Sequence, residues 1–230
     1  MKIPTWPTTI KLTGLSLDGM GGHSAGDVAS QTVVKALHEL EQKPLLSDFV
    51  DDIEDCLVTT NSQLVELAAK DNNVVGTTVV GFALRQSHCL YYWVGDSRLY
   101  RLRGEKLLQL SIDHTYTQEM IQHGELTPEE ARDHPQKNVI TRAVGGDSEL
   151  FTDFEMDAIQ HGDCFLICSD GVEKKSSDQE VEAIMLKHGN DLDKSGQEII
   201  DLVVSRGAPD NVTLILVLVL VQDLPDDKKW

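Results

Sequence analysis

The stretch Thr77–Leu110, TTVVGFALRQSHCLYYWVGDSRLYRLRGEKLLQL, decides the architecture of this chain. It contains four short runs rich in β-branched, aromatic and leucine residues, and turn-forming residues (RQSH, GDS and GE) separate them. Such spacing is typical of consecutive strands joined by tight turns. The stretch therefore predicts an antiparallel meander.

Helical patterns flank this meander. Apolar residues recur at intervals of three and four within 25–42 and 47–70, which predicts two amphipathic helices. Later in the chain, Thr127 and Ser177 each stand three residues before a glutamate, the spacing of a capping box that starts a helix. Gly189 is expected to end the helix that Ser177 opens. Strands and helices come in separate blocks rather than in strict alternation, which favours an α+β fold with mostly antiparallel sheets.

Three further strands are expected after the meander, near 150–156, 164–168 and 211–221. The last of these is apolar on both faces. Because strands covered on both faces lose the alternation of polar and apolar residues, we expect it to lie centrally between layers.

Four aspartates stand at the ends of apolar runs, each beside a small or turn-forming residue: Asp18, Asp96, Asp170 and Asp210. Any one of them alone is typical of a turn. Four strand ends can converge at one edge of a packed sheet structure, and clustered carboxylates repel one another unless a cation neutralises them. Mg²⁺ and Mn²⁺ prefer such oxygen ligands. The pattern predicts a divalent metal site.

The composition narrows the class of partner. The 230 residues carry a formal net charge of −18, which disfavours nucleic acids and anionic membrane surfaces. The longest apolar run, 212–221, is about half the length of a membrane helix. The four cysteines form no CxxC pair, as expected for reduced thiols. We expect a cytoplasmic protein with one domain, 1–222, and a charged tail, 223–230.

In order along the chain, these motifs resemble the metal-dependent protein phosphatases, the PPM or type 2C family, in their bacterial form. The resemblance extends from Asp18 to about Val221 and rests on these stretches: Asp18-Gly19-Met20-Gly21-Gly22-His23, Gly76-Thr77-Thr78, Gly95-Asp96-Ser97-Arg98, Asp113-His114, Glu129-Glu130-Ala131-Arg132 with His134-Pro135, Ser169-Asp170-Gly171 and Asp210-Asn211. It implies a four-layer α/β/β/α sandwich of two antiparallel sheets flanked by helices. Residues 113–146 would form the flap beside the active site, which in this family is linked to substrate choice.

The resemblance also implies the metal ligands. Asp18 would bridge two Mn²⁺ or Mg²⁺ ions, and the carbonyl of Gly19 would bind the first. Asp170 and Asp210 would hold the second ion, and Asp96 together with Asp170 would hold a weaker third.

The implied reaction is hydrolysis of phosphoserine and phosphothreonine in phosphorylated proteins, targets of a serine/threonine kinase. A metal-bridging hydroxide would attack phosphorus, so that no protein nucleophile is needed. His23 is our candidate for the acid that protonates the leaving oxygen. The alternative is that His23 is a helix-start histidine with no role in proton transfer.

One family motif is missing. Family members carry an opening strand and an Arg-x-x-Asn-Glu-Asp motif before the DGMGG turn, whereas the 17 residues before Asp18 contain no arginine and no acidic residue. We therefore expect an N-terminal strand to be absent, with Arg98 and Arg142 as candidates to replace the phosphate-binding arginine. A pseudo-phosphatase that binds phosphoproteins or metals without turnover is the alternative function. A structural Ca²⁺-binding module is least supported, since no DxDxDG loop is present.

Overall fold

The computed structural model describes residues 4–5, 11–20, 23–41, 43, 46–71, 73–85, 87–208, 210–220 and 222–223. The predicted meander is present as four strands: β5 (Val79–Arg85), β6 (His88–Val94), β7 (Arg98–Arg103) and β8 (Lys106–Gln109). The first two belong to one sheet and the last two to another, so the chain crosses between sheets at the turn that contains Asp96.

Each sheet has four strands, and every strand pair in them is antiparallel. The first sheet has the order β2-β5-β6-β9, where β2 is Lys11–Ser16 and β9 is Asp153–Ala158. The second has the order β11-β10-β7-β8, where β10 is Cys164–Cys168 and β11 is Leu214–Leu218.

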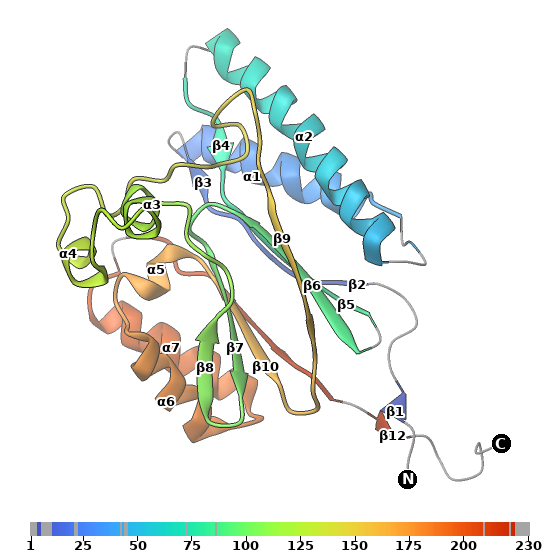
Figure 1. The fold of residues 1–230 in the computed structure, drawn as a ribbon, viewed down its shortest axis with the longest axis vertical. Coiled ribbons are helices and arrows are strands. Elements are labelled where there is room, and N and C mark those ends of the chain that lie inside the picture. The colour runs from blue at the N-terminus through green and yellow to red at the C-terminus, as the bar shows by residue number, and fades with distance from the viewer. Residues whose placement is uncertain are drawn as a thin grey trace.

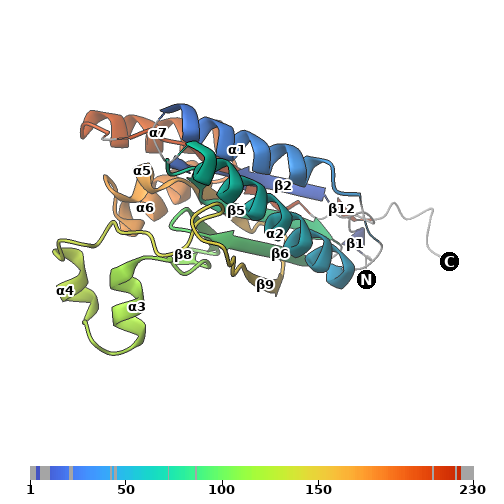
Figure 2. The ribbon, with the colours of Figure 1, turned by 90° about the horizontal axis from the view of Figure 1, so that it is seen from above.

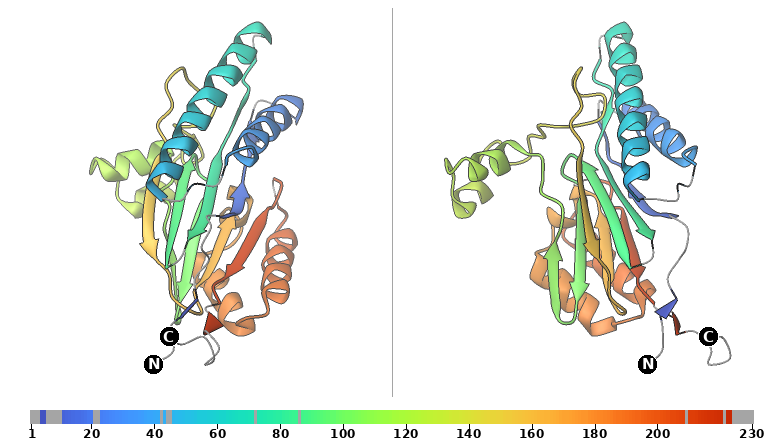
Figure 3. Two further views of the ribbon diagram at one scale, coloured as in Figure 1. Left: turned by 90° about the vertical axis from the view of Figure 1, so that its right-hand side faces the viewer. Right: turned by 45° about the vertical axis from the view of Figure 1, so that its right-hand side comes forward.

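Helices cover the outer face of each sheet (Figures 1 and 3). The first sheet lies against α1 (His23–His38) and α2 (Leu46–Asp71), and the second against α6 (Asp178–His188) and α7 (Leu192–Ser205). Ser177 and Gly189 bound α6 as predicted, with both hydrogen bonds of the capping box formed. The four-layer α/β/β/α sandwich that the resemblance implied is confirmed.

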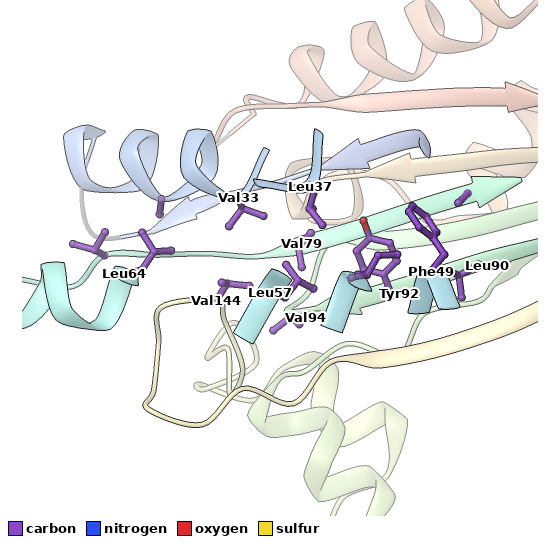
Figure 4. Packing of buried hydrophobic residues seen from close by; sticks show 14 of the residues in the cluster. Val33, Leu37, Phe49, Leu57, Leu64, Val79, Leu90, Tyr92, Val94 and Val144 are labelled. Carbon is purple, nitrogen blue, oxygen red and sulfur yellow. The ribbon is translucent and has the colours of Figure 1, made fainter. Parts of the chain in front are cut away.

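Strand β6 shows how the layers are held together. Leu90, Tyr92 and Val94 pack beneath α1 and α2, and Figure 4 shows Val94 beside Leu57 and Leu90 beside Phe49. The alternate residues of β6 face the other sheet, where an inter-sheet core gathers Cys89, Tyr91, Trp93, Phe82, Phe165 and Ile167. The period of two in a strand therefore produces separate cores on its two faces.

The last strand lies between layers as predicted, but its expected central position is wrong. Strand β11 lies at the edge of its sheet, where it pairs with β10 and, among the described residues, with no second strand. Both of its faces are nevertheless covered, by α7 and by β2 of the opposite sheet. Apolar residues on both faces of a strand thus indicate that other layers pack on both faces. They do not indicate whether the strand is central or at the edge of its sheet.

The remaining elements lie around the two ends of the sandwich. Strand β3 (Gly19–Met20) pairs with β4 (Gly76–Thr77), and β1 (Pro4–Thr5) pairs with β12 (Gln222–Asp223). Neither four-stranded sheet includes β1. Beyond Asp223, the expected tail lies outside the described residues. No helix in the described ranges has the length and apolarity needed to cross a membrane.

The expected flap protrudes from the sandwich and carries two short helices (Figures 1 and 2). They are α3 (Tyr116–Gln122) and α4 (Pro128–Arg132), and α4 begins with the predicted capping box of Thr127 and Glu130. At the base of the flap, Thr115 and Ile140 form an antiparallel bridge. Near the same end of the sandwich, the short helix α5 (Asp170–Glu173) follows β10.

Candidate metal centre

Asp18 follows β2, and two threonines of the Gly76-Thr77-Thr78 motif fix its backbone. The amide of Asp18 donates a hydrogen bond to Thr78 Oγ1 at 3.0 Å. Its carbonyl accepts bonds from the amide of Thr78 at 2.9 Å and from Thr77 Oγ1 at 3.0 Å. Both threonines are fully buried, so their positions leave Asp18 little freedom.

The hydroxyl of Thr78 also connects the loop that contains Asp18 to the turn that contains Asp96. Thr78 Oγ1 lies 2.9 Å from the hydroxyl of the buried Ser97. Between Asp96 and strand β6 stands Gly95, with φ of 109°, and a side chain there would lie 2.6 Å from Thr78 Cγ2. Glycine is thus required for the turn that presents Asp96.

Asp170 and Asp210 are brought together by pairing between the end of β10 and the segment before β11. The amide of Ser169 donates to the Thr213 carbonyl at 3.0 Å, and the amide of Thr213 donates to Ser169 Oγ at 3.2 Å. A Cβ on Gly171 would lie 2.5 Å from the carbonyl oxygen of Asn211. The glycine after Asp170 therefore permits this close approach.

The aspartates lie close enough to perturb one another. Burial raises the pKa of Asp18 to about 6, and the neighbouring Asp170 and Asp210 carboxylates add to the shift. Burial, followed by the charges of Asp170 and Asp113, raises the pKa of Asp96 to about 7. An open cleft of about 520 Å³ includes Asp18, Gly19 and Asp210 in its lining. Asp18 and Asp96 thus lie near Asp170, and Asp210 lies near Asp18.

Asp170 has the features of a cation ligand. Its side chain is buried, and its Oδ1 accepts no hydrogen bond from the described residues. A buried carboxylate oxygen without a hydrogen-bond donor destabilises the folded state. A hard divalent ion would stabilise it by binding to that oxygen. In the described ranges, no group of three or more His, Cys, Asp or Glu side chains stands ready-assembled around one ion position. The carboxylates would draw together around an ion that offsets their repulsion.

Lys174 supplies a positive charge in this arrangement. It lies one helical turn after Asp170, and its ammonium forms an ion pair with Asp170 Oδ2. Burial favours the neutral amine, but the hydrogen bond to Asp170 and the charges of Asp170, Asp96 and Asp210 raise the pKa of Lys174 above its ordinary value. Sequence reasoning missed this residue, although a lysine four positions after an aspartate is a recognisable helical pair.

The structure places the other two expected site residues, Gly19 and His23, at or beside the start of α1. Gly19 lies against Gly26 of α1, where an added Cβ would meet the carbonyl oxygen of Gly26 at 2.4 Å. His23 is the first residue of α1, but its side chain lies outside the described residues, so its role as an acid stays a prediction.

Neither arginine considered as a phosphate ligand is free to act as one. Arg98 donates to both carboxylate oxygens of Asp113, with Nε bonds of 2.9 and 3.0 Å, and lies 3.2 Å from Glu173. Arg142 pairs with Asp153 at 3.1 Å, and it lines a separate cavity. The proposed replacement of the missing arginine by either residue is not supported by these contacts.

A second cleft, of about 590 Å³, lies between the flap and the end of the sandwich that carries Asp96. Five basic side chains line it, Arg132 and Lys137 of the flap together with Arg98, Lys174 and Lys175, and so do three acidic ones, Asp96, Asp113 and Glu173. Buried His114 anchors the base of the flap, since its Nδ1 accepts a bond from the amide of Gly95 at 3.0 Å. Basic side chains therefore outnumber acidic ones in the cleft beside Asp96, although Arg98 and Lys174 are paired with carboxylates.

Known proteins share this sandwich fold, and they identify the class to which the chain belongs. The sequence model of the protein phosphatase 2C family matches residues 10–215. A serine/threonine phosphatase, stp, of Listeria innocua is 36% identical over 206 residues, which span 87% of this chain and 81% of the relative.

Solved structures agree with this match. The serine/threonine phosphatase of S. agalactiae aligns with a TM-score of 0.84 and 30% identity, covering 94% of this chain and 92% of that one. The catalytic domain of the phosphatase PstP, solved with 2 manganese ions, aligns with a TM-score of 0.75 and 27% identity over 96% and 97% of the two chains. The chain belongs to the protein phosphatase 2C (PPM) family, as the sequence resemblance indicated.

Proposed function

We propose that this chain hydrolyses phosphoserine and phosphothreonine esters of proteins with the help of two Mn²⁺ or Mg²⁺ ions held by Asp18, Gly19, Asp170 and Asp210. The observation that carries the proposal is that aspartates from separate strand ends lie near Asp170, whose buried Oδ1 accepts no hydrogen bond from the described residues. Family membership and the named phosphatase relatives support it. The manganese ions in the PstP structure support the choice of metal.

The chain's own residues would hold and orient the reactants. Thr78, Ser97 and Ser169 fix the backbone beside the aspartates, and the carboxylates would draw together when an ion binds. When bound, divalent ions would activate water and neutralise charge on the phosphoryl group. A cysteine nucleophile is disfavoured, because burial raises the pKa of Cys89 and Cys168 to about 12.

The cleft beneath the flap would receive the phosphorylated segment. Its lining holds more basic than acidic side chains, in contrast with the net charge of −18 on the chain as a whole, and this excess favours an anionic substrate. Proton transfer by His23 completes the proposal. The expected partners are substrates of a serine/threonine kinase, and the four free thiols suit a reducing compartment such as the cytoplasm.

Hydrolysis of p-nitrophenyl phosphate and of a phosphothreonine peptide tests the proposal, with Mn²⁺ and then with excess chelator. We expect turnover that requires the metal and that is lost in Asp18→Asn and Asp170→Asn. Asp27→Asn is the matched control, because Asp27 lines the same cleft from α1 but is exposed. It should retain activity.

Two results would contradict the proposal. Turnover that survives Asp18→Asn would show that the metal ligands are assigned wrongly. Phosphopeptide binding without turnover in a folded, Mn²⁺-loaded protein would favour the pseudo-phosphatase, which no relative's name supports.

A further inference from the structure

Lys174 occupies an unusual place for a lysine. Its ammonium is paired with a carboxylate oxygen of Asp170, and its side chain is only 24% exposed. The same ammonium interacts with the charges of Asp96 and Asp210. A single tethered cation therefore faces three of the four strand-end aspartates.

Asp96 and Asp170 are the two residues from which a weaker third ion is expected, beside the two ions of the proposed centre. They lie close enough for the charge of Asp170 to perturb Asp96. Lys174 lines the same cleft as Asp96, on the side of α5. The lysine thus stands where an ion shared by these two carboxylates would bind.

We propose that the ammonium of Lys174 replaces the third divalent ion, so that this protein binds two ions and not three. The inference rests on the proposed function, since it requires the two-ion centre. An ammonium offers three donors and a positive charge without a coordination shell. It neutralises part of the Asp96–Asp170 pair and repels an incoming divalent cation.

Asp170 is able to serve both roles at once. Its Oδ2 is engaged by Lys174, whereas its Oδ1 is buried and accepts no hydrogen bond from the described residues. The first oxygen faces the lysine, and the second remains for an ion of the centre. One carboxylate thereby separates the two core ions from the tethered cation.

Counting bound Mn²⁺ tests the inference without measuring catalysis. Isothermal titration calorimetry, with electron paramagnetic resonance of free Mn²⁺ as a second readout, gives the stoichiometry for each protein. We expect two ions for the wild type and three for Lys174→Met, which keeps the chain length but removes the charge. Lys174→Arg keeps a cation and should stay at two.

Two controls assign the effect to this position. Lys175→Met removes a neighbouring charge from the same cleft and should leave the count at two. Adding Asp96→Asn to Lys174→Met should return the count from three to two, because Asp96 would be a ligand of the new ion.

Three ions in the wild type, or two in Lys174→Met, would overturn the inference. If the wild type and Lys174→Met both bind two ions and Asp18→Asn abolishes that binding, only the role of Lys174 is refuted. A wild type that binds no Mn²⁺ would refute the metal centre and this inference together.

Discussion

The hydroxyl of Thr78 lies 2.9 Å from the hydroxyl of Ser97 and also accepts the amide hydrogen of Asp18 at 3.0 Å. One buried side chain thus joins the loop that ends β2 to the turn where the chain crosses between sheets. Asp18 and Asp96, the aspartates of those two loops, depend on it for their relative position.

Replacing Thr78 by valine should weaken Mn²⁺ binding by about tenfold to a hundredfold, the range found for residues that orient metal ligands. The shape of the side chain is preserved, but the amide of Asp18 loses its acceptor and the hydroxyl of Ser97 its partner. Calorimetric Mn²⁺ titration measures the change. Thr60→Val is the matched control, because Thr60 is equally buried but bonds only within α2. Equal losses of affinity in the two variants would refute the link.

Two helical glycines should respond oppositely to alanine. In α1, a Cβ on Gly26 would lie 2.6 Å from the backbone of Gly19, which cannot move without shifting the Asp18 loop. In α7, a Cβ on Gly196 would lie 3.3 Å from Leu214 Cδ1, the mobile end of a side chain. We expect Gly26→Ala to lower the melting temperature and Mn²⁺ affinity. Gly196→Ala should be nearly neutral, because about 1 kcal/mol gained in helix propensity offsets the crowding. A harmless Gly26→Ala would contradict this account.

Arg98→Met should cost roughly 3–5 kcal/mol of stability, the typical result of breaking a buried ion pair from one side. The change leaves Asp113 and Glu173 without their cation. Denaturant unfolding measures it, with Lys194→Met as the control. Lys194 forms an exposed pair with Asp191, so its loss should change the stability far less than the loss of Arg98. If Arg98→Met instead retained stability and lost phosphate affinity, Arg98 would be the missing phosphate ligand.

The metal-free protein should lose stability as the pH rises from about 5 to 7.5 through the contribution of Asp96. Its folded pKa of about 7 exceeds the model-compound value of 3.8, so the folded state binds more protons in this range. The loss from this group is on the order of 2–3 kcal/mol. Melting in chelator at both pH values measures it. His114, whose pKa burial lowers, acts in the opposite direction, so the comparison is made against Asp96→Asn. A wild type and variant with parallel pH profiles would refute the prediction.

Much of the fold follows from local patterns. Ser177 and Gly189 bound α6, and the turn residues of the meander separate its strands, because capping and turn formation involve residues close in the sequence. The position of β11 at the edge of its sheet cannot be predicted from such local patterns. It depends on which strands pair across the sheet, and both faces of β11 are covered regardless.

The sequence allowed us to predict which aspartates belong to the site. It did not allow us to predict most of the contacts that the site residues make. Asp18, Asp96, Asp170 and Asp210 are recognisable because each follows or precedes an apolar run beside a turn residue. The engagement of Arg98 by Asp113, 15 residues away, depends on the folded arrangement of β7 and the loop after β8. The pair of Lys174 with Asp170 is local, and helical spacing would have identified it.

The outer part of the flap begins and ends at one place, the bridge between Thr115 and Ile140, and α4 within it is capped by its own Thr127 and Glu130. Residues 116–139 therefore form an insert that can be exchanged as a unit, because hydrogen bonds between its own residues stabilise its local structure. Changing the length of such an insert alters closure entropy slowly, by about 0.6 kcal/mol per doubling. Descendants of one ancestral scaffold can thus diversify here, and a designer can graft another segment here, while the aspartate framework stays intact.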